Sequence, residues 1–387
     1  MKEPTSVKER LTEMKDVSEL ILDLSYSAAL FDHKAIAEEV SRLEDKMDQL
    51  IYEIRISAIL GARNRDAAEK MSGVLQIAEA AEKISNASGD IANIVLEDIE
   101  LPPEFKGYLT KAEELITKKK VSNGSGENKS LGELKLESRT GFRVIAIRRG
   151  ENWIYNPNKK TVLEKNDIVI ARGPFEGVKD FHKMITGEEI EPDVESIDSG
   201  RSYKAGEIAM EMKNISELAT DLAYSAILLY NEEISQEVKQ LEEEMDSLNN
   251  KLEMWVLRSA KQYEGDELDS LSGLLRLGRA SEVVSDAAME MADVVLRGIE
   301  LHPILALAIR ESKDIITRLE VKEESEVVGK KIGDLSIKTK TGMHIMAVRR
   351  KNSWIYNPSA RTELEKGDII ISKGTREGEK RLKKLVT

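Results

Sequence analysis

One feature constrains the fold of this chain more than any other, because most of the sequence occurs twice. The pentapeptide Trp-Ile-Tyr-Asn-Pro occupies residues 153–157 and returns at 354–358, and the stretch 24–50 is similar to 222–248. The copied unit fills half of the 387-residue chain, far more than one unit of a solenoid, so each copy should contain whole domains with their own cores. We therefore expect an even number of domains, and either two related sites or one site at a pseudo-twofold interface.

Composition narrows the class of protein. A net charge of −13 argues against nucleic-acid binding, which depends on Lys and Arg at phosphates. The absence of Cys excludes disulfides, thiolate metal sites and cysteine nucleophiles. No apolar run approaches the roughly 18 residues needed to cross a bilayer, and no apolar signal segment follows the first residues. The sequence predicts a soluble, cytoplasmic protein.

The first part of each copy has a helical pattern. Apolar residues recur at steps of three and four, which places them on one face of a helix. This stripe consists of Val40, Leu43, Met47 and Leu50 in the first copy and Val238, Leu241, Met245 and Leu248 in the second. Proline at 102–103 and at 303 then breaks the helical pattern, and 105–117 is expected to form one more helix. Each half should begin with an antiparallel bundle of three or four helices.

The second part of each copy changes to short β-branched runs. These runs are 144–147 and 168–170 in the first copy and 345–348 and 369–371 in the second, and glycine and proline bound them. Short helices are expected at 176–185 and 377–385. The pattern is typical of small α+β domains.

These patterns predict four domains in alternation. The helical bundles should span 8–120 and 205–318, and the small domains should span 128–187 and 319–387. Polar segments at 121–127 and 188–200 should be surface linkers.

The small domains resemble the C-terminal domain of regulators of potassium conductance, called RCK_C or TrkA-C. The second copy carries Gly329-Lys330 at its start, a Gly-to-Arg strand over 342–350, Asn357-Pro358, and Gly367-Asp368 before the last strand. The first copy keeps the strand over 141–149 and Asn156-Pro157 but has Asn128 and Asn166 in place of two glycines. We expect a Ser/Gly linker to replace its opening strand.

The helical parts resemble PhoU domains, whose helices carry Glu-x-x-x-Asp steps. Three such steps are Glu44/Asp48, Glu242/Asp246 and Glu282/Asp286, whereas Asn86 interrupts the step that begins at Glu82. The resemblance implies internally duplicated PhoU-like helical bundles that alternate with small RCK_C-like α+β sandwiches. It also implies a cytosolic regulator of cation or phosphate transport rather than an enzyme.

The RCK_C resemblance implies a site for a small anionic ligand, such as cyclic di-AMP or another nucleotide. Strand alternation lets only one arginine of each pair, 148–149 and 349–350, face a given pocket. The resemblance favours Arg149 and Arg350. It places Val144, Ile145, Ile345 and Met346 as an apolar wall, and Asn156, Pro157, Asn357 and Pro358 as the closing turn. Alternatively, the arginines only protect an edge strand from aggregation.

The acidic steps predict a divalent metal site in the helical bundles. Carboxylates four residues apart share a helix face, and oxygen ligands suit hard cations. The preferred set is Glu242, Asp246, Glu282 and Asp286; the second choice is Glu44, Asp48, Glu82 and Asp90. Ordinary solvated carboxylates are the alternative.

The sequence thus predicts a regulatory subunit that controls a membrane potassium or cation transporter or channel by a ligand-driven population shift. A metal-binding regulator of phosphate uptake and a scaffold without ligand are the alternatives. Its expected location is the cytoplasm, at the membrane through its transporter partner. The chain should act as a homo-oligomer or as an intrachain pseudo-dimer. No nucleophile elbow, phosphate loop or metalloprotease spacing suggests catalysis.

Overall fold

The computed structural model describes most of the chain. The described residues are 6–102, 115–122, 126–155, 157–174, 177–188, 204–262, 266–305, 307, 315–351, 353–356, 358–374 and 376–386. Within these ranges, every helix is too short or too polar to cross a membrane.

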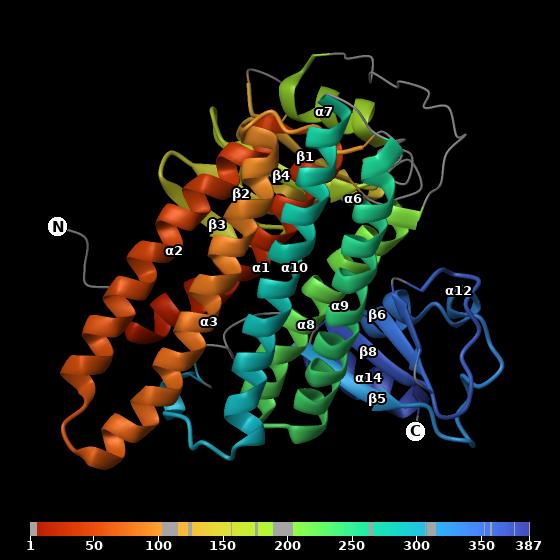
Figure 1. Cartoon of the computed structure of the whole chain (residues 1–387). Coiled ribbons are helices and arrows are strands. Elements are labelled where there is room, and N and C mark those ends of the chain that lie inside the picture. The colour runs from red at the N-terminus through yellow and green to blue at the C-terminus, as the bar shows by residue number, and fades with distance from the viewer. Residues whose placement is uncertain are drawn as a thin grey trace.

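Among the described residues, six long helices form the centre of the molecule (Figure 1). The first half contributes α1 (Val7–Phe31), α2 (Lys34–Gly61) and α3 (Arg65–Leu96). The second half contributes α8 (Lys204–Leu229), α9 (Glu232–Ser259), which continues into the short η2 (Ala260–Gln262), and α10 (Asp266–Leu296). Each trio packs as a bundle, and the bundles join through α3 with α10 and α1 with α8. We call this six-helix body the helical layer.

Helix boundaries follow from local side-chain chemistry. Ser6 and Glu9 form a capping box at the start of α1. Asn64 and Asn231 accept hydrogen bonds from the first backbone N–H groups of α3 and α9. Asp32 and Tyr230 take left-handed conformations at the equivalent turns after α1 and α8, with φ of 49° and 47°. The duplication therefore extends to the turns that set the helix order.

Each half also contains a small four-stranded antiparallel sheet. The first module contains β1 (Leu115–Lys120), α5 (Leu131–Leu134), α6 (Leu136–Thr140), β2 (Arg143–Arg149), β3 (Asn152–Tyr155), β4 (Ile168–Gly173) and α7 (Val178–Thr186). The second module contains β5 (Ile315–Glu320), α12 (Ile332–Leu335), α13 (Ile337–Thr341), β6 (Met343–Arg350), β7 (Ser353–Tyr356), β8 (Ile369–Gly374) and α14 (Arg376–Val386).

The two sheets have the same topology. Their strand orders are β1-β4-β2-β3 and β5-β8-β6-β7, and each has a bulge at the same place, near Ile145 and near Met346. The predicted fold class, with helical bundles and small α+β modules in tandem duplication, is confirmed.

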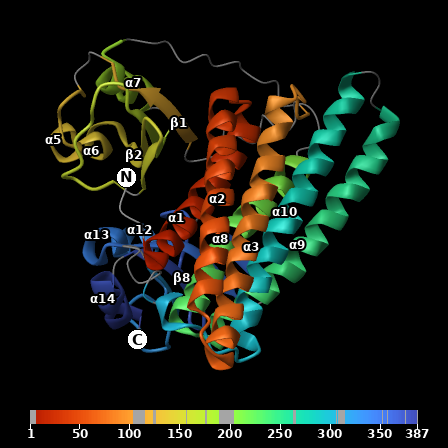
Figure 2. The same cartoon turned by 90° about the vertical axis from the view of Figure 1, so that its left-hand side faces the viewer.

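Each sheet lies between its own terminal helix and the helical layer. One face packs with α7 or α14 around a module core that includes Val144 and Ile147, or Ile345 and Val348. The other face adds Ala146, Ile170, Ala347 and Ile371 to the core of the helical layer. Both modules lie on the same side of that layer, the first near one end and the second near the other (Figure 2).

Three expectations about the start of the modules are wrong. The first module does not lack its opening strand, because β1 pairs with β4 as β5 pairs with β8. Residues 115–120 and 315–318, assigned to the helical bundles, therefore belong to the sheets. Residues 115–117, expected as the end of a helix, are part of β1. The rest of that expected helix, 105–114, lies outside the described residues.

The two halves interlock inside the helical layer. The hydroxyl of Tyr26 on α1 lies 2.8 Å from that of Ser216 on α8 and 2.7 Å from that of Ser281 on α10. The equivalent Tyr224 donates a hydrogen bond of 2.9 Å to Ser18 on α1. The helical part of the chain is thus an intrachain pseudo-dimer with a buried polar junction.

Candidate functional site

The paired arginines of the two sheets point to opposite sides. Arg149 and Arg350 bond to the turn that precedes the last strand of their own module. Arg148 and Arg349 bond to carboxylates of the helical layer. Strand alternation accounts for this division.

Arg149 holds a carboxylate that the sequence analysis did not select. Its Nε and Nη2 donate hydrogen bonds of 2.9 and 2.8 Å to the two carboxylate oxygens of Asp167, which is 1% exposed. Nη2 also donates to the carbonyl of Val162, and Nη1 pairs with Glu164. Arg350 repeats the geometry with Asp368, Glu363 and Glu365.

These partners already occupy the guanidinium groups. Hydrogen bonding to Asp167 and Asp368 raises the pKa of Arg149 and Arg350, although partial burial opposes this. An incoming anion must therefore share or replace these carboxylates. Asp167 and Asp368 stand at the same place in both copies, directly before the last strand, and this repeated acidic residue is the sequence signal for a partner of the arginines.

The residues predicted as an apolar wall are divided between two cores. Val144 and Ile345 are buried in the module cores. Ile145 and Met346, at the bulges, pack against the helical layer. The four residues therefore do not form one apolar wall beside Arg149 and Arg350.

The predicted closing turns can be placed only in part. Pro157 and Pro358 are half-buried at the end of β3 and β7, whereas Asn156 and Asn357 lie outside the described residues. Next to them, Trp153 and Tyr155 are parallel, with ring centroids 6.1 Å apart, and both pack against the helical layer.

The second arginine of each pair meets a buried glutamate. Arg148 donates through Nε (2.6 Å) and Nη2 (2.8 Å) to Glu39 on α2, which is 0% exposed, and Lys118 on β1 lies 2.7 Å from the same carboxylate. In the second half, Arg349 and Arg318 lie 2.7 and 3.2 Å from Glu237 on α9. We call Glu39 and Glu237 the bridging carboxylates.

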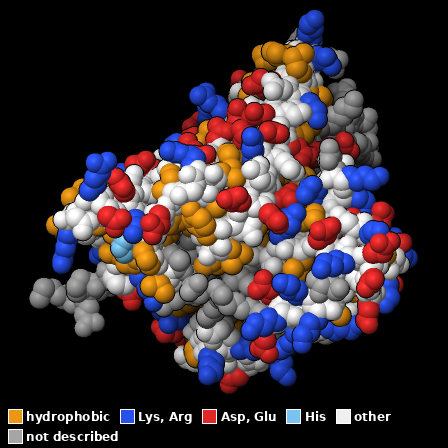
Figure 3. Space-filling model, turned by 90° about the horizontal axis from the view of Figure 1, so that it is seen from below, with side chains coloured by type: hydrophobic (Ala, Val, Ile, Leu, Met, Phe, Trp, Pro, Cys, Tyr) orange, Lys and Arg blue, Asp and Glu red, His pale blue; other side chains and the backbone are white. Residues whose placement is uncertain are grey.

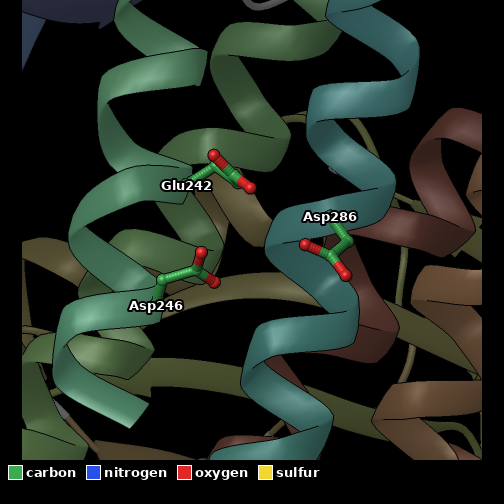
Figure 4. Close-up of side chains that lie close together, drawn as sticks. All are labelled: Glu242, Asp246 and Asp286. Carbon is green, nitrogen blue, oxygen red and sulfur yellow. The ribbon is translucent and has the colours of Figure 1, made fainter. Parts of the chain in front are cut away.

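Three predicted metal ligands meet in the second bundle. Glu242 and Asp246 on α9 and Asp286 on α10 point toward one another, and one carboxylate oxygen of each lies within 4.8 Å of the others (Figure 4). Partial burial and then the neighbouring Asp246 raise the pKa of Glu242 and of Asp286. These oxygens could hold a hard divalent cation.

The fourth predicted ligand is bound elsewhere. Glu282, one turn before Asp286, accepts a hydrogen bond of 2.7 Å from the amide of Asn249. The trio comes together without it.

The first bundle is arranged differently. Glu82 pairs with Arg55 at 2.6 Å. Glu44 lies against Gly89, where a Cβ atom would overlap its carboxylate. Burial, then Asp48 and Asp90, raise the pKa of Glu44 to about 7. Among the described residues, only the second bundle brings three such groups within ligand distance.

Comparison with known families agrees with the sequence resemblances. The PhoU domain matches residues 11–95 and 209–295, and the TrkA-C domain matches 120–186 and 316–387. Together these segments cover most of the chain in strict alternation.

Individual relatives match only in part. A probable potassium channel protein 2 of Methanocaldococcus jannaschii is 30% identical over 140 residues, which are 34% of this chain and 39% of that protein. The Ktr system potassium uptake protein C of Bacillus subtilis is 24% identical over 156 residues, which are 40% of this chain and 68% of that protein.

A solved structure of similar sequence is the RCK_C domain dimer of S. agalactiae BusR in complex with c-di-AMP. It is 31% identical to this chain, covers 18% of it and 88% of its own length, and has a TM-score of 0.18. BusR has also been solved with promoter DNA.

Proposed function

Because the chain belongs to the PhoU and TrkA-C domain families, each present twice, we propose that it is a regulatory subunit of a membrane potassium transporter or channel. The observation that carries this proposal is the fixed attachment of two TrkA-C modules to one helical layer through buried ion pairs. The similarity to potassium channel and uptake proteins supports potassium as the transported ion in this proposal. The regulation is non-catalytic in this proposal, and the transporter is a separate chain in the membrane.

The arrangement of the modules suits a regulator that joins several chains. The two modules lie near different ends of the helical layer (Figures 1 and 2). Pairing between TrkA-C modules would therefore involve a second copy of the chain. The pseudo-dimer of bundles would hold two such contacts at a fixed separation.

The chain is not proposed to bind nucleic acid. On the underside of the molecule, lysine and arginine side chains are interspersed with aspartate and glutamate over the residues shown (Figure 3). The net charge of −13 also disfavours binding to the negatively charged phosphates of nucleic acid. This stays a prediction, since the BusR complex with promoter DNA shows that an RCK_C protein can be part of a DNA-binding protein.

The proposed signal is an anionic ligand at the outer end of β6 or β2. Arg350 and Arg149 are about a third exposed and present guanidinium groups to solvent beside their carboxylate partners. An anion that competes with Asp368 or Asp167 would alter the turn that these carboxylates stabilise. Cyclic di-AMP is the first probe because an RCK_C relative was solved with it.

Arg350→Gln is expected to weaken anion binding about tenfold or more, because a charge-assisted hydrogen bond contributes about 1.5–3 kcal/mol. Calorimetric titration of cyclic di-AMP, ATP and inorganic phosphate into both proteins checks this. Glutamine is chosen since it keeps a hydrogen-bond donor near Asp368 and adds no negative charge.

Lys351→Gln is the matched control for that experiment. Lys351 is the next residue, is exposed and carries the same charge, so its loss should leave affinity within about twofold by the usual weakness of exposed charges. The anion proposal fails if no probe binds the wild type at millimolar concentration, or if both variants lose affinity equally.

A metal-binding regulator of phosphate uptake is the second candidate. The convergence of Glu242, Asp246 and Asp286 favours it. Bringing three carboxylates together is unfavourable unless a proton or a cation offsets their charge.

Mn²⁺ or Mg²⁺ is therefore expected to raise the midpoint temperature of thermal unfolding. At a metal concentration a hundredfold above the dissociation constant, the free energy of unfolding should rise by about 2.7 kcal/mol. Asp286→Asn should abolish most of the shift. Without metal, the raised pKa of Glu242 means that its contribution to stability is greatest at low pH and is lost as pH rises through the folded-state pKa. The metal-induced shift should have the opposite dependence, growing with pH.

Asp269→Asn serves as the control for this measurement, because Asp269 is an exposed carboxylate on the same helix, away from the trio. Equal midpoints in chelator and in excess metal would rule out the metal candidate without affecting the anion proposal.

A further inference from the structure

The contact between each module and the helical layer is built around one buried charge. Glu39 is fully buried, yet two cations from the module's sheet, Arg148 and Lys118, reach its carboxylate. Glu237 is 2% exposed and receives Arg349 and Arg318 in the same way. One buried glutamate and two cations of the sheet meet in this way in both halves, although Arg148 donates two hydrogen bonds to its glutamate and Arg349 donates through Nη2 alone. The repetition of the partners indicates a built attachment rather than a chance surface pair.

The chemistry of this contact makes it sensitive to small displacements. Burial alone would raise the pKa of Glu39, but hydrogen bonds from Arg148 and Lys118 bring it below its ordinary value, so the carboxylate stays ionised. Separating a buried ion from its partners is strongly unfavourable because neither group regains full hydration. The strand cannot shift away from α2 without breaking these bonds together.

The attachment is continuous with the outer arginine. Arg148 and Arg149 are consecutive residues of β2, and they bond to Glu39 and Asp167 on opposite sides of the sheet. Arg148 also donates to the carbonyl of Gly150 in the following turn. Arg349 and Arg350 repeat this arrangement with Glu237, Asp368 and the carbonyl of Lys351.

A third cation of the second module also contacts the helical layer. Lys373 on β8 lies 3.2 Å from Asp221 on α8 and 3.6 Å from Glu19 on α1. One side chain of the second module thus contacts both halves of the helical layer.

We propose that the bridging carboxylates Glu39 and Glu237 couple the modules to the helical layer, so that a change at Arg149 or Arg350 moves the adjacent arginine and thereby loosens or tightens the start of α2 or α9. The coupling is a property of the fold; its use in signalling rests on the proposed function.

Hydrogen exchange on the full chain, without any ligand, tests the coupling. The proteins compared are wild type, Arg149→Gln, Glu39→Gln and the double variant. Arg149→Gln should speed amide exchange in β2. It should also speed exchange in residues 35–43 of α2 by about tenfold, because local opening of that segment becomes easier. In the Glu39→Gln background, adding Arg149→Gln should leave residues 35–43 unchanged, because the link is already broken.

Glu38→Gln is the matched control. Glu38 is exposed on the same turn of α2, so the effect of Arg149→Gln on residues 35–43 should persist in its presence. Where Glu39→Gln prevents folding, Arg148→Met replaces it, since this variant removes the strand side of the bridge and leaves Lys118 with Glu39.

The proposal is overturned if Arg149→Gln leaves residues 35–43 unaffected in the wild type, or if its effect survives the loss of Glu39 or Arg148. No anion enters this experiment, so a failed ligand titration and a failed coupling test are separate results.

Discussion

Replacing Tyr26 by alanine is expected to lower the free energy of unfolding by about 3–5 kcal/mol, the usual range for removing a buried aromatic side chain. Tyr26 is 0% exposed and lies where α1 meets α8 and α10. Its removal leaves a cavity between the two halves and deprives Ser216 of its hydroxyl partner. Urea unfolding followed by circular dichroism measures the change.

Tyr26→Phe separates the hydroxyl from the ring. It should cost about 1–3 kcal/mol, because the polar neighbours stay buried while one partner is lost. Tyr52→Ala is the control: Tyr52 is 66% exposed on α2, so the change should stay within about 0.5 kcal/mol. If Tyr26→Ala were as mild as Tyr52→Ala, the junction between the halves would not contribute to stability.

The helical layer was readable from the sequence because its helices obey a simple period. Val40, Leu43, Met47 and Leu50 are all buried, as the stripe predicts, and the second copy repeats this. The duplication then predicted the same order of helices in both halves, with three or four helices in each. It also made the common strand order of the two sheets predictable, since equivalent glycines and apolar residues recur at the same places.

The opening strands were hidden by their composition. β1 reads Leu-Ile-Thr-Lys-Lys-Lys, and consecutive lysines do not suggest a buried strand. The structure shows why they are tolerated: Lys118 faces the helical layer and is neutralised by Glu39. That partner lies far away in the sequence, so no local pattern could reveal it.

The candidate sites show the same limit. Alternation correctly separates Arg148 from Arg149, but it does not tell which carboxylate each of them meets. The acidic steps locate Glu242, Asp246 and Asp286, whereas the diversion of Glu282 depends on Asn249 from the neighbouring helix. Local spacing predicts which residues share a face, and packing between elements decides their partners.

Asp368→Asn is expected to destabilise the second module by about 2–4 kcal/mol, because it removes a buried charge that accepts three hydrogen bonds. The carboxylate is 1% exposed and holds both Arg350 and the backbone N–H of Glu365. The asparagine side chain has the same shape but only one acceptor oxygen, and its amide N–H would face either the guanidinium or that backbone N–H. Hydrogen exchange in β6 and β8 should speed up while α9 and α10 stay protected.

A double-variant cycle tells whether Arg350 is the partner that makes Asp368 important. Arg350→Gln alone should cost less than Asp368→Asn, because Arg350 is partly exposed and its loss leaves Asp368 with the N–H of Glu365. The double variant should be more stable than additivity of the two single changes predicts, by about 1–3 kcal/mol, since the pair can be lost only once. Asp334→Asn, an exposed carboxylate in α12, is the control and should be near neutral. Strict additivity would mean that Asp368 acts through the turn at Glu365 alone, and an anion at Arg350 would then have no carboxylate to displace.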